Sequence, residues 1–148
     1  MSANEEERDA VEVLEEQLAN ARAARSKEAK AQYAIDLQAR IDLEEQHGTI
    51  AAVKVSVFAK GQPTMALLKT PTGIQYKRYK DQIFKAVERS NTKDKQDAVD
   101  TLARSCWVYP ASKEAQDSML EAFPGLLATL ASAATSLAEG KAEEEGKG

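Results

Sequence analysis

The residues best suited to acid–base or nucleophilic chemistry are the only histidine, His47, and the only cysteine, Cys106. A catalytic histidine or thiolate requires supporting groups. These are a second histidine, a nucleophile motif, or a positive environment that ionises the thiol. The sequence supplies none of these, and an enzyme built on this chain would have to work with carboxylates alone. We therefore expect His47 to interact with carbonyls at a helix end, Cys106 to be a core thiol, and the protein not to be an enzyme.

Metal and cofactor sites also lack their usual patterns. One His and one Cys cannot complete the usual zinc site, and the carboxylates of "NEEERD" and "EEEG" are not spaced as in a calcium loop. The segments "KGQPT" and "TPTGI" hold single glycines, unlike the glycine-rich loops that bind phosphate. We expect no metal and no cofactor, and a lone cysteine leaves nothing that depends on an oxidising compartment.

Basic and aromatic side chains are interleaved in "YKRYKDQIFK", which is the one nucleic-acid signal in the chain. The aromatic residues lie at the spacing of a helix core, and the motifs of known RNA-binding modules are missing. We therefore expect a solvated basic helix face and no nucleic-acid binding. Such a face can still attract an acidic protein partner, which makes Lys77, Arg78 and Lys80 candidate partner-binding residues.

The charge of the 148-residue chain falls into three blocks. Residues 1–47 hold 6 Lys/Arg against 12 Asp/Glu, residues 48–110 hold 11 against 5, and residues 111–148 hold 3 against 7. Acidic ends are repelled by phosphate, so the pattern favours contacts within the chain or a protein partner of opposite charge. The start "MSANEEERDA" is unlike a secretory signal, and no window approaches 18 uninterrupted apolar residues. We expect a soluble, cytoplasmic protein without a membrane contact.

The elements that must position these residues begin with a long helix over residues 4–47, which contain no Gly or Pro and end at Gly48, a residue suited to a left-handed cap. Its apolar residues form two short patches that are out of register with each other. The first comprises Val11, Leu14, Leu18 and Ala21, and the second Ala34, Leu37 and Ile41. This pattern predicts contacts with neighbours at both ends of the helix, with a solvated helix as the alternative.

A period of two follows the long helix. Val53, Val55 and Val57 alternate with other side chains, and "TMALLK" places Met65 and Leu67 on one face, so the two runs predict an antiparallel hairpin that turns around "KGQP". We expect one face of the hairpin to lie on a core, since a two-stranded hairpin is not stable alone in water.

Four helices are predicted after the hairpin. Thr70 and Pro71 can start the first, and Ser90, Asn91 or Thr92 can cap the second. Their inward positions are expected to be Ile74, Tyr76, Tyr79, Ile83, Phe84 and Val87, and then Ala98, Val99, Leu102 and Cys106.

An extended "WVY" before Pro110 leads to the last two helices. Ser112 can cap the third helix, Pro124 can be the first residue of the fourth, and Gly140 can end it. The inward residues are expected to be Met119, Leu120 and Phe123, and then Leu126, Leu127, Leu130, Ala134 and Leu137.

The predicted fold class is mainly α with a small β-hairpin (α+β): a long N-terminal helix, an antiparallel hairpin and a four-helix C-terminal bundle. We expect a charged helix over residues 1–48, a hairpin plus helical domain over residues 49–140, and a disordered acidic tail over residues 141–148.

Three segments, "LLKTPTGIQYKRYKDQI", "LARSCWVYPAS" and "AFPGLLATLASAATSLAEG", give the chain a resemblance to a known family. Over residues 53–140 it resembles the tail assembly chaperones of long-tailed bacteriophages. The resemblance implies a non-enzymatic protein of the host cytoplasm that coats the helical tape-measure protein, keeps it soluble and helps to recruit tail-tube subunits.

An apolar groove beside the last two helices would let such a chaperone hold an amphipathic helix. We expect its contacts at Leu126, Leu127, Leu130 and Leu137, because the final helix is poor in charge. The alternative is that these leucines fill the core of the domain itself. A second hypothesis is a structural or adaptor component of a virion or other large assembly, which interacts through its long N-terminal helix. Association of the chain with copies of itself is compatible with both hypotheses.

Overall fold

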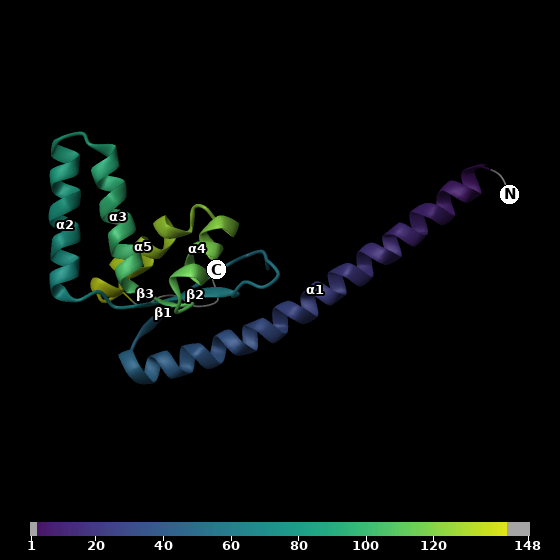
Figure 1. Ribbon diagram of the computed structural model, residues 1–148, viewed down its shortest axis with the longest axis horizontal. Helices are drawn as coiled ribbons and strands as arrows, with labels where there is room; N and C mark the ends of the chain where they lie inside the picture. The colour runs from purple at the N-terminus through teal and green to yellow at the C-terminus, as the bar shows by residue number, and fades with distance from the viewer. Residues whose placement is uncertain (1–2, 142–148) are drawn as a thin grey trace.

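The computed structural model describes residues 3–141 (Figure 1). The chain is mainly α, with five helices and a three-stranded antiparallel sheet, which confirms the predicted fold class. The predicted tail, beyond Lys141, lies outside the described residues. The elements in chain order are α1 (Ala3–His47), β1 (Ile50–Lys54), β2 (Met65–Lys69), α2 (Gly73–Glu88), α3 (Thr92–Cys106), β3 (Trp107–Tyr109), α4 (Lys113–Ala122) and α5 (Leu126–Ala138).

The sheet has the strand order β1-β2-β3, with Ala52 opposite Leu67 and Leu68 opposite Trp107. The predicted hairpin is present, but the extended "WVY" segment adds a third strand to it. Strand β1 is also shorter than predicted. It ends at Lys54, and Val57 is exposed in the loop before β2. Only Val55 continues the pairing, through a 3.0 Å bond from its N–H to the carbonyl oxygen of Thr64.

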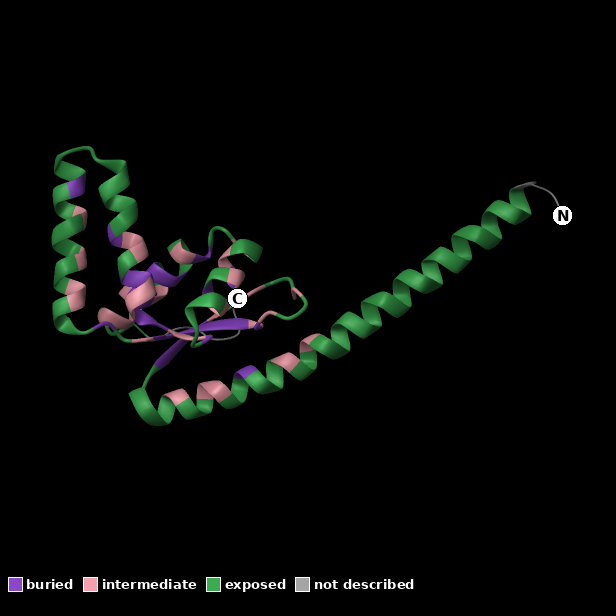
Figure 2. Ribbon diagram, viewed as in Figure 1, coloured by how far each residue is buried: buried purple, intermediate pink, exposed green. Residues whose placement is uncertain are grey.

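Both faces of the sheet are buried, whereas we predicted one (Figure 2). The pleat sends Leu68 and Trp107 into the main core, where they meet residues of the last three helices. Met65 and Leu67 point to the other face, where Leu43 of α1 packs on them. The central strand is therefore apolar on both sides because a layer of helix covers each side. The large buried side chains that the helices supply to the main core are Leu102, Cys106, Met119, Leu126 and Leu130.

Local side chains fix the starts of α2, α3 and α4. Asn91 and Ser112 cap α3 and α4 as predicted, each accepting a bond from a backbone N–H at 3.1 Å. Helix α2 begins two residues later than predicted, because Thr72 forms a complete capping box: its hydroxyl accepts from the N–H of Gln75 and its N–H donates to the side chain of Gln75. Thr70 is not the cap.

Helix α5 begins at Leu126, after a turn through Pro124 and Gly125, rather than at the proline itself. Helices α4 and α5 meet at an angle of 115°. Within the described part of the chain, no single helix is long and apolar enough to cross a membrane. Only this bent pair meets the criteria of length and composition, and then only when both helices are counted together.

Helix α1 has two parts, one that packs on the sheet and one that projects into solvent. From Ala29 to Leu43 one of its sides lies against the sheet, and Gly48, with φ +82°, turns the chain into β1. Residues 4–28 are exposed on every side and extend far from the rest of the molecule (Figures 1 and 2). The helix therefore both docks on the domain and projects from it.

Candidate interaction surface

The two residues whose types best suit catalysis, Cys106 and His47, lie in the core and at an exposed helix end, respectively. Cys106 is fully buried at the end of α3, and burial raises the pKa of its thiol from 9.0 to about 11, although the charge of Lys69 lowers it in part. His47 is exposed in the last turn of α1. Across residues 3–141, no three His, Cys, Asp or Glu side chains lie together as a metal site would need.

Asp36 is a buried carboxylate that sequence reasoning missed. It accepts bonds from the N–H of Thr64 at 2.7 Å, from the side chain of Gln32 at 2.8 Å, and from the hydroxyls of Thr64 and Tyr109. Burial raises the pKa of Tyr109, and the hydrogen bond and charge of Asp36 raise it further. All the partners of Asp36 are protein groups, so this cluster joins α1 to the β1–β2 loop and to β3. One feature of the sequence indicates this buried carboxylate: Asp36 lies on the same side of α1 as Ala29 and Leu43, which are half-buried against the domain.

The four predicted groove leucines do not line an open groove. Leu126 and Leu130 are buried in the main core, and Leu127 and Leu137 are half-buried against it. The reason is that α5 packs on α3 and on the sheet, so its apolar side faces the interior. Leu126 and Leu130 therefore fill the core of the domain, which is the alternative that we considered, and they are not accessible to a partner in this structure.

The outer side of α2 carries the apolar residues that the domain leaves exposed. We predicted that Ile74, Phe84 and Val87 would face the core, and this was wrong: they are 73%, 65% and 60% exposed. At 3.6 residues per turn, the core positions are instead half-buried Ile83 and buried Ala86, together with other residues on that side of the helix. The opposite side of α2 has no neighbour among residues 3–141.

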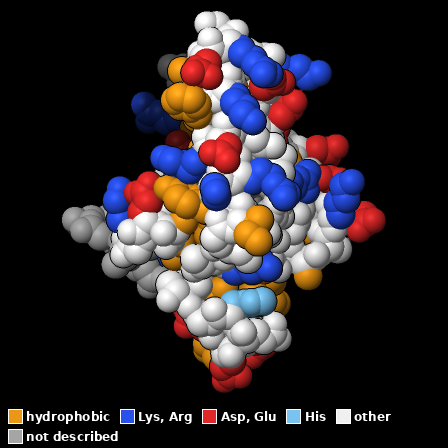
Figure 3. All heavy atoms as spheres, turned by 90° about the vertical axis from the view of Figure 1, so that its left-hand side faces the viewer, with side chains coloured by type: hydrophobic (Ala, Val, Ile, Leu, Met, Phe, Trp, Pro, Cys, Tyr) orange, Lys and Arg blue, Asp and Glu red, His pale blue; other side chains and the backbone are white. Residues whose placement is uncertain are grey.

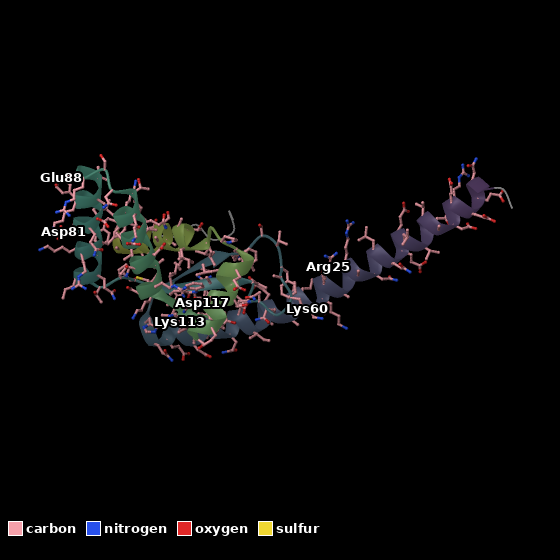
Figure 4. All side chains as sticks on the ribbon, turned by 45° about the horizontal axis from the view of Figure 1, so that its top comes forward. Arg25, Lys60, Asp81, Glu88, Lys113 and Asp117 are labelled. Atoms are coloured by element: carbon pink, nitrogen blue, oxygen red, sulfur yellow. The ribbon has the colours of Figure 1, made fainter. Side chains whose placement is uncertain are left out.

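Basic side chains surround these apolar residues. Lys77, Arg78 and Lys80 are all exposed, and within Gly73–Glu88 four Lys or Arg stand against two carboxylates. Figure 3 looks onto this side of the molecule and shows basic side chains with hydrophobic ones between them. The two carboxylates, Asp81 and Glu88, lie on this same outer side of α2 (Figure 4), so its charge is positive in net but mixed in sign. We call Ile74, Lys77, Lys80, Phe84 and Val87 the α2 surface.

The groove between α2 and α3 is a weaker candidate. Near the ends of the two helices it is lined by cations, Lys85 and Arg89, and by carboxylates, Asp94 and Asp97. Here two cations stand against two carboxylates, whereas α2 as a whole carries four cations against two carboxylates, so this groove selects no partner by its charge.

The α2 surface is held on a fixed support. The capping box fixes the start of α2, and the hydroxyl of Tyr76 donates to Glu139 at the end of α5, at 3.4 Å. The ammonium of Lys80 lies 5.9 Å from the centre of the Tyr76 ring. A straight helix side with three apolar side chains and a basic border can bind a second helix whose apolar stripe has an acidic border. Comparison with known proteins gives no match among family models, curated proteins or solved structures.

Proposed function

We propose that this protein is a non-enzymatic binding protein that holds an acidic, amphipathic helical segment of another polypeptide on its α2 surface. The observation that carries the proposal is the exposure of Ile74, Phe84 and Val87 on a basic helix. Large apolar side chains that gather on one helix side of a soluble domain mark protein interaction sites.

The chemistry of the partner follows from the surface. Its apolar side chains recur at helical spacing, to lie on Phe84 and Val87 and, about 15 Å away along α2, on Ile74. Its flanking residues are acidic, since Lys77 and Lys80 border the apolar positions and attract negative charge at contact. A phosphate-bearing ligand fits this surface less well than an amphipathic helix. It would bind the basic side chains but leave Ile74, Phe84 and Val87 exposed to water.

The resemblance to tail assembly chaperones suggests which partner this is. The segment "LLKTPTGIQYKRYKDQI", which carries part of that resemblance, also contains the first half of the α2 surface. On this proposal the partner is the tape-measure protein, whose helices are covered until tail-tube subunits assemble around them. The site of contact is α2, not the groove beside α5 that we first expected.

The binding mode is tested with a synthetic acidic peptide. The peptide has leucines at i, i+3, i+4 and i+7 and glutamates on the other side, and fluorescence anisotropy measures its affinity for the full chain. We expect Phe84→Ser to weaken binding by about tenfold or more, because burial of a phenylalanine contributes about 1.5–3 kcal/mol. Val57→Ser is the matched control, since Val57 is 67% exposed but lies in the β1–β2 loop.

The identity of the partner is tested by co-expression with a tape-measure polypeptide of a long-tailed bacteriophage. We expect the chain to keep that polypeptide soluble, and Phe84→Ser, but not Val57→Ser, to abolish the effect. Equal solubility with both variants, each still folded by circular dichroism, would contradict the proposal.

An adaptor role is the second candidate, and one observation favours it: residues 4–28 of α1 project with every side exposed. A permanent component of an assembly would use this segment to reach neighbouring subunits. Deletion of residues 1–28 separates the two roles. A chaperone keeps its partner bound through α2 after the deletion, whereas an adaptor no longer enters its assembly.

A further inference from the structure

The projecting part of α1 carries an apolar stripe that nothing in the domain covers. Val11, Leu14 and Leu18 are 51%, 62% and 45% exposed, and Ala21 follows at the next position of the stripe. Helices without tertiary contacts are only marginally stable in water. A helix of this length with a stripe of large apolar residues therefore calls for a partner.

The stripe lies in line with the side of α1 that docks on the sheet. Residues 18 apart in a helix are five full turns apart, so they face the same way. Leu18 therefore faces the same way as buried Asp36, and Val11 the same way as half-buried Ala29. This relation explains why the second patch, Ala34, Leu37 and Ile41, is out of register: it lies on the far side of the helix. The stripe extends an interface that already exists within the molecule.

Charge along the projecting segment is divided in two. Residues 3–18 hold seven carboxylates and one arginine, and residues 22–30 hold four cations and one carboxylate. Two copies side by side in the same direction would place acidic against acidic and basic against basic. In opposite directions, each acidic part lies beside a basic part, and such pairing of opposite charges sets orientation in coiled coils.

We propose that the occupant of the stripe is a second copy of this chain, whose α1 pairs antiparallel with the first and crosses it at Leu18. This register places residues 8–16 of one copy beside residues 20–28 of the other, over about 30 Å of the projecting part of the helix. The two Leu18 side chains meet on a two-fold axis, with Leu14 and Val11 on either side of them. The interface is the same patch on both copies, as closed two-fold dimers require.

Arg25 supports the orientation. It lies on the stripe itself, where an apolar residue would be expected, and in the antiparallel register it stands opposite Val11 of the other copy. Its stem can cover that valine while its guanidinium reaches Glu7 or Glu12 beside it. In a parallel pair Arg25 would stand against itself.

The start of the second helix also meets positive charge. Residues 5–7 of one copy then reach the point, near Ala29, where α1 of the other copy meets its own domain. In Figure 4, Lys60 of the β1–β2 loop and Arg25 both lie where α1 leaves the domain. The acidic first turn of each copy, Glu5 and Glu6, would thus be drawn to the domain of the other.

The test is the molar mass of the full chain in solution, measured by sedimentation equilibrium. We expect a dimer, which Leu18→Glu weakens by about 100-fold or more, since two buried leucines are lost and 1.4 kcal/mol is a tenfold change. The matched control is Ile41→Glu on the far side of α1, where an exposed apolar residue is also replaced by a carboxylate. The control variant should dimerise like the parent chain.

The direction is tested with single cysteine variants, which buried Cys106 does not disturb. We expect a mixture of Val11→Cys and Arg25→Cys chains to form a disulfide between unlike chains, and Val11→Cys alone to form none. A monomer at about 100 μM, or a disulfide of Val11→Cys with itself, would overturn the proposal. So would a dimer that Phe84→Ser disrupts and Leu18→Glu does not, because the acidic end of α1 would then lie on the α2 surface of another copy.

Discussion

At the scale of single residues, Asp36 has the largest structural role that we can test. It is the one charged side chain that is buried among residues 3–141, and it accepts bonds from Thr64 and Tyr109. Asp36→Ala leaves four half-buried donor groups without their acceptor, and we expect it to cost on the order of 2–4 kcal/mol of the free energy of unfolding in urea. Asp42→Ala, an exposed aspartate on the same helix, should cost less than about 0.5 kcal/mol.

The pH dependence of stability should reflect Tyr109. Its pKa in the folded protein is raised above the ordinary 10.0, first by burial and then by Asp36. The unfolded chain therefore loses this proton at lower pH than the folded chain, so the stabilisation is complete below pH 10 and is lost as the pH rises above it. We expect the free energy of unfolding to fall less steeply above pH 10 in Tyr109→Phe than in the parent chain. Equal slopes would contradict the role of Tyr109.

Cys106 gives a chemical test of the core. Its thiol is fully buried and its pKa is about 11. We expect iodoacetamide at pH 8 to alkylate it only when the chain opens, at a rate at least about 100-fold below that in urea, because the thiolate is the reacting form. Mass spectrometry follows the modification. Rapid alkylation of the folded chain would identify Cys106 as the reactive nucleophile that we rejected.

At the scale of elements, local signals could be predicted and long-range ones could not. The caps Asn91 and Ser112 and the left-handed Gly48 follow from side chains and backbone freedom within a few residues. The pairing of Trp107 with Leu68 could not be predicted, because no local sequence pattern determines which strand an extended segment pairs with. The outward side of α2 was also missed, since apolar residues such as Phe84 lie on both sides of that helix and only its packing on α3 selects one.

Two helix-start signals lie only two residues apart before α2, and sequence alone does not distinguish them. Thr70 before Pro71 and Thr72 before Gly73 both fit a helix start, and the structure uses the second, where Gln75 completes the capping box. We expect Thr72→Ala to reduce the free energy of unfolding by about 1 kcal/mol and Thr70→Ala to leave it unchanged. The same loss in both variants would show that the two threonines act through the loop rather than through the cap.

At the scale of the whole molecule, part of α1 packs on the sheet, and we expect the folding unit to include that part as well as the hairpin and the later helices. The second face of the sheet is covered by α1 from Ala29 to Leu43, and Asp36 within that stretch holds Thr64 and Tyr109. Residues 4–28 are all exposed, so their deletion should leave the melting temperature of the domain unchanged apart from any effect of dimerisation. Deletion of residues 1–46 removes both the buried carboxylate and the apolar cover, and exposes Met65 and Leu67 to water.

We therefore expect the longer deletion to lower the melting temperature by 10 °C or more, or to yield insoluble protein, since about 1 kcal/mol shifts a domain of this size by roughly 4 °C. Differential scanning calorimetry at low protein concentration compares the two deletions with the full chain while dimer formation is weak. If the chain without residues 1–46 melts like the full chain, α1 is an attachment that the sheet does not need. The boundary that we predicted at residue 48 would then be the true one, and the contacts of Asp36 would contribute nothing to the fold.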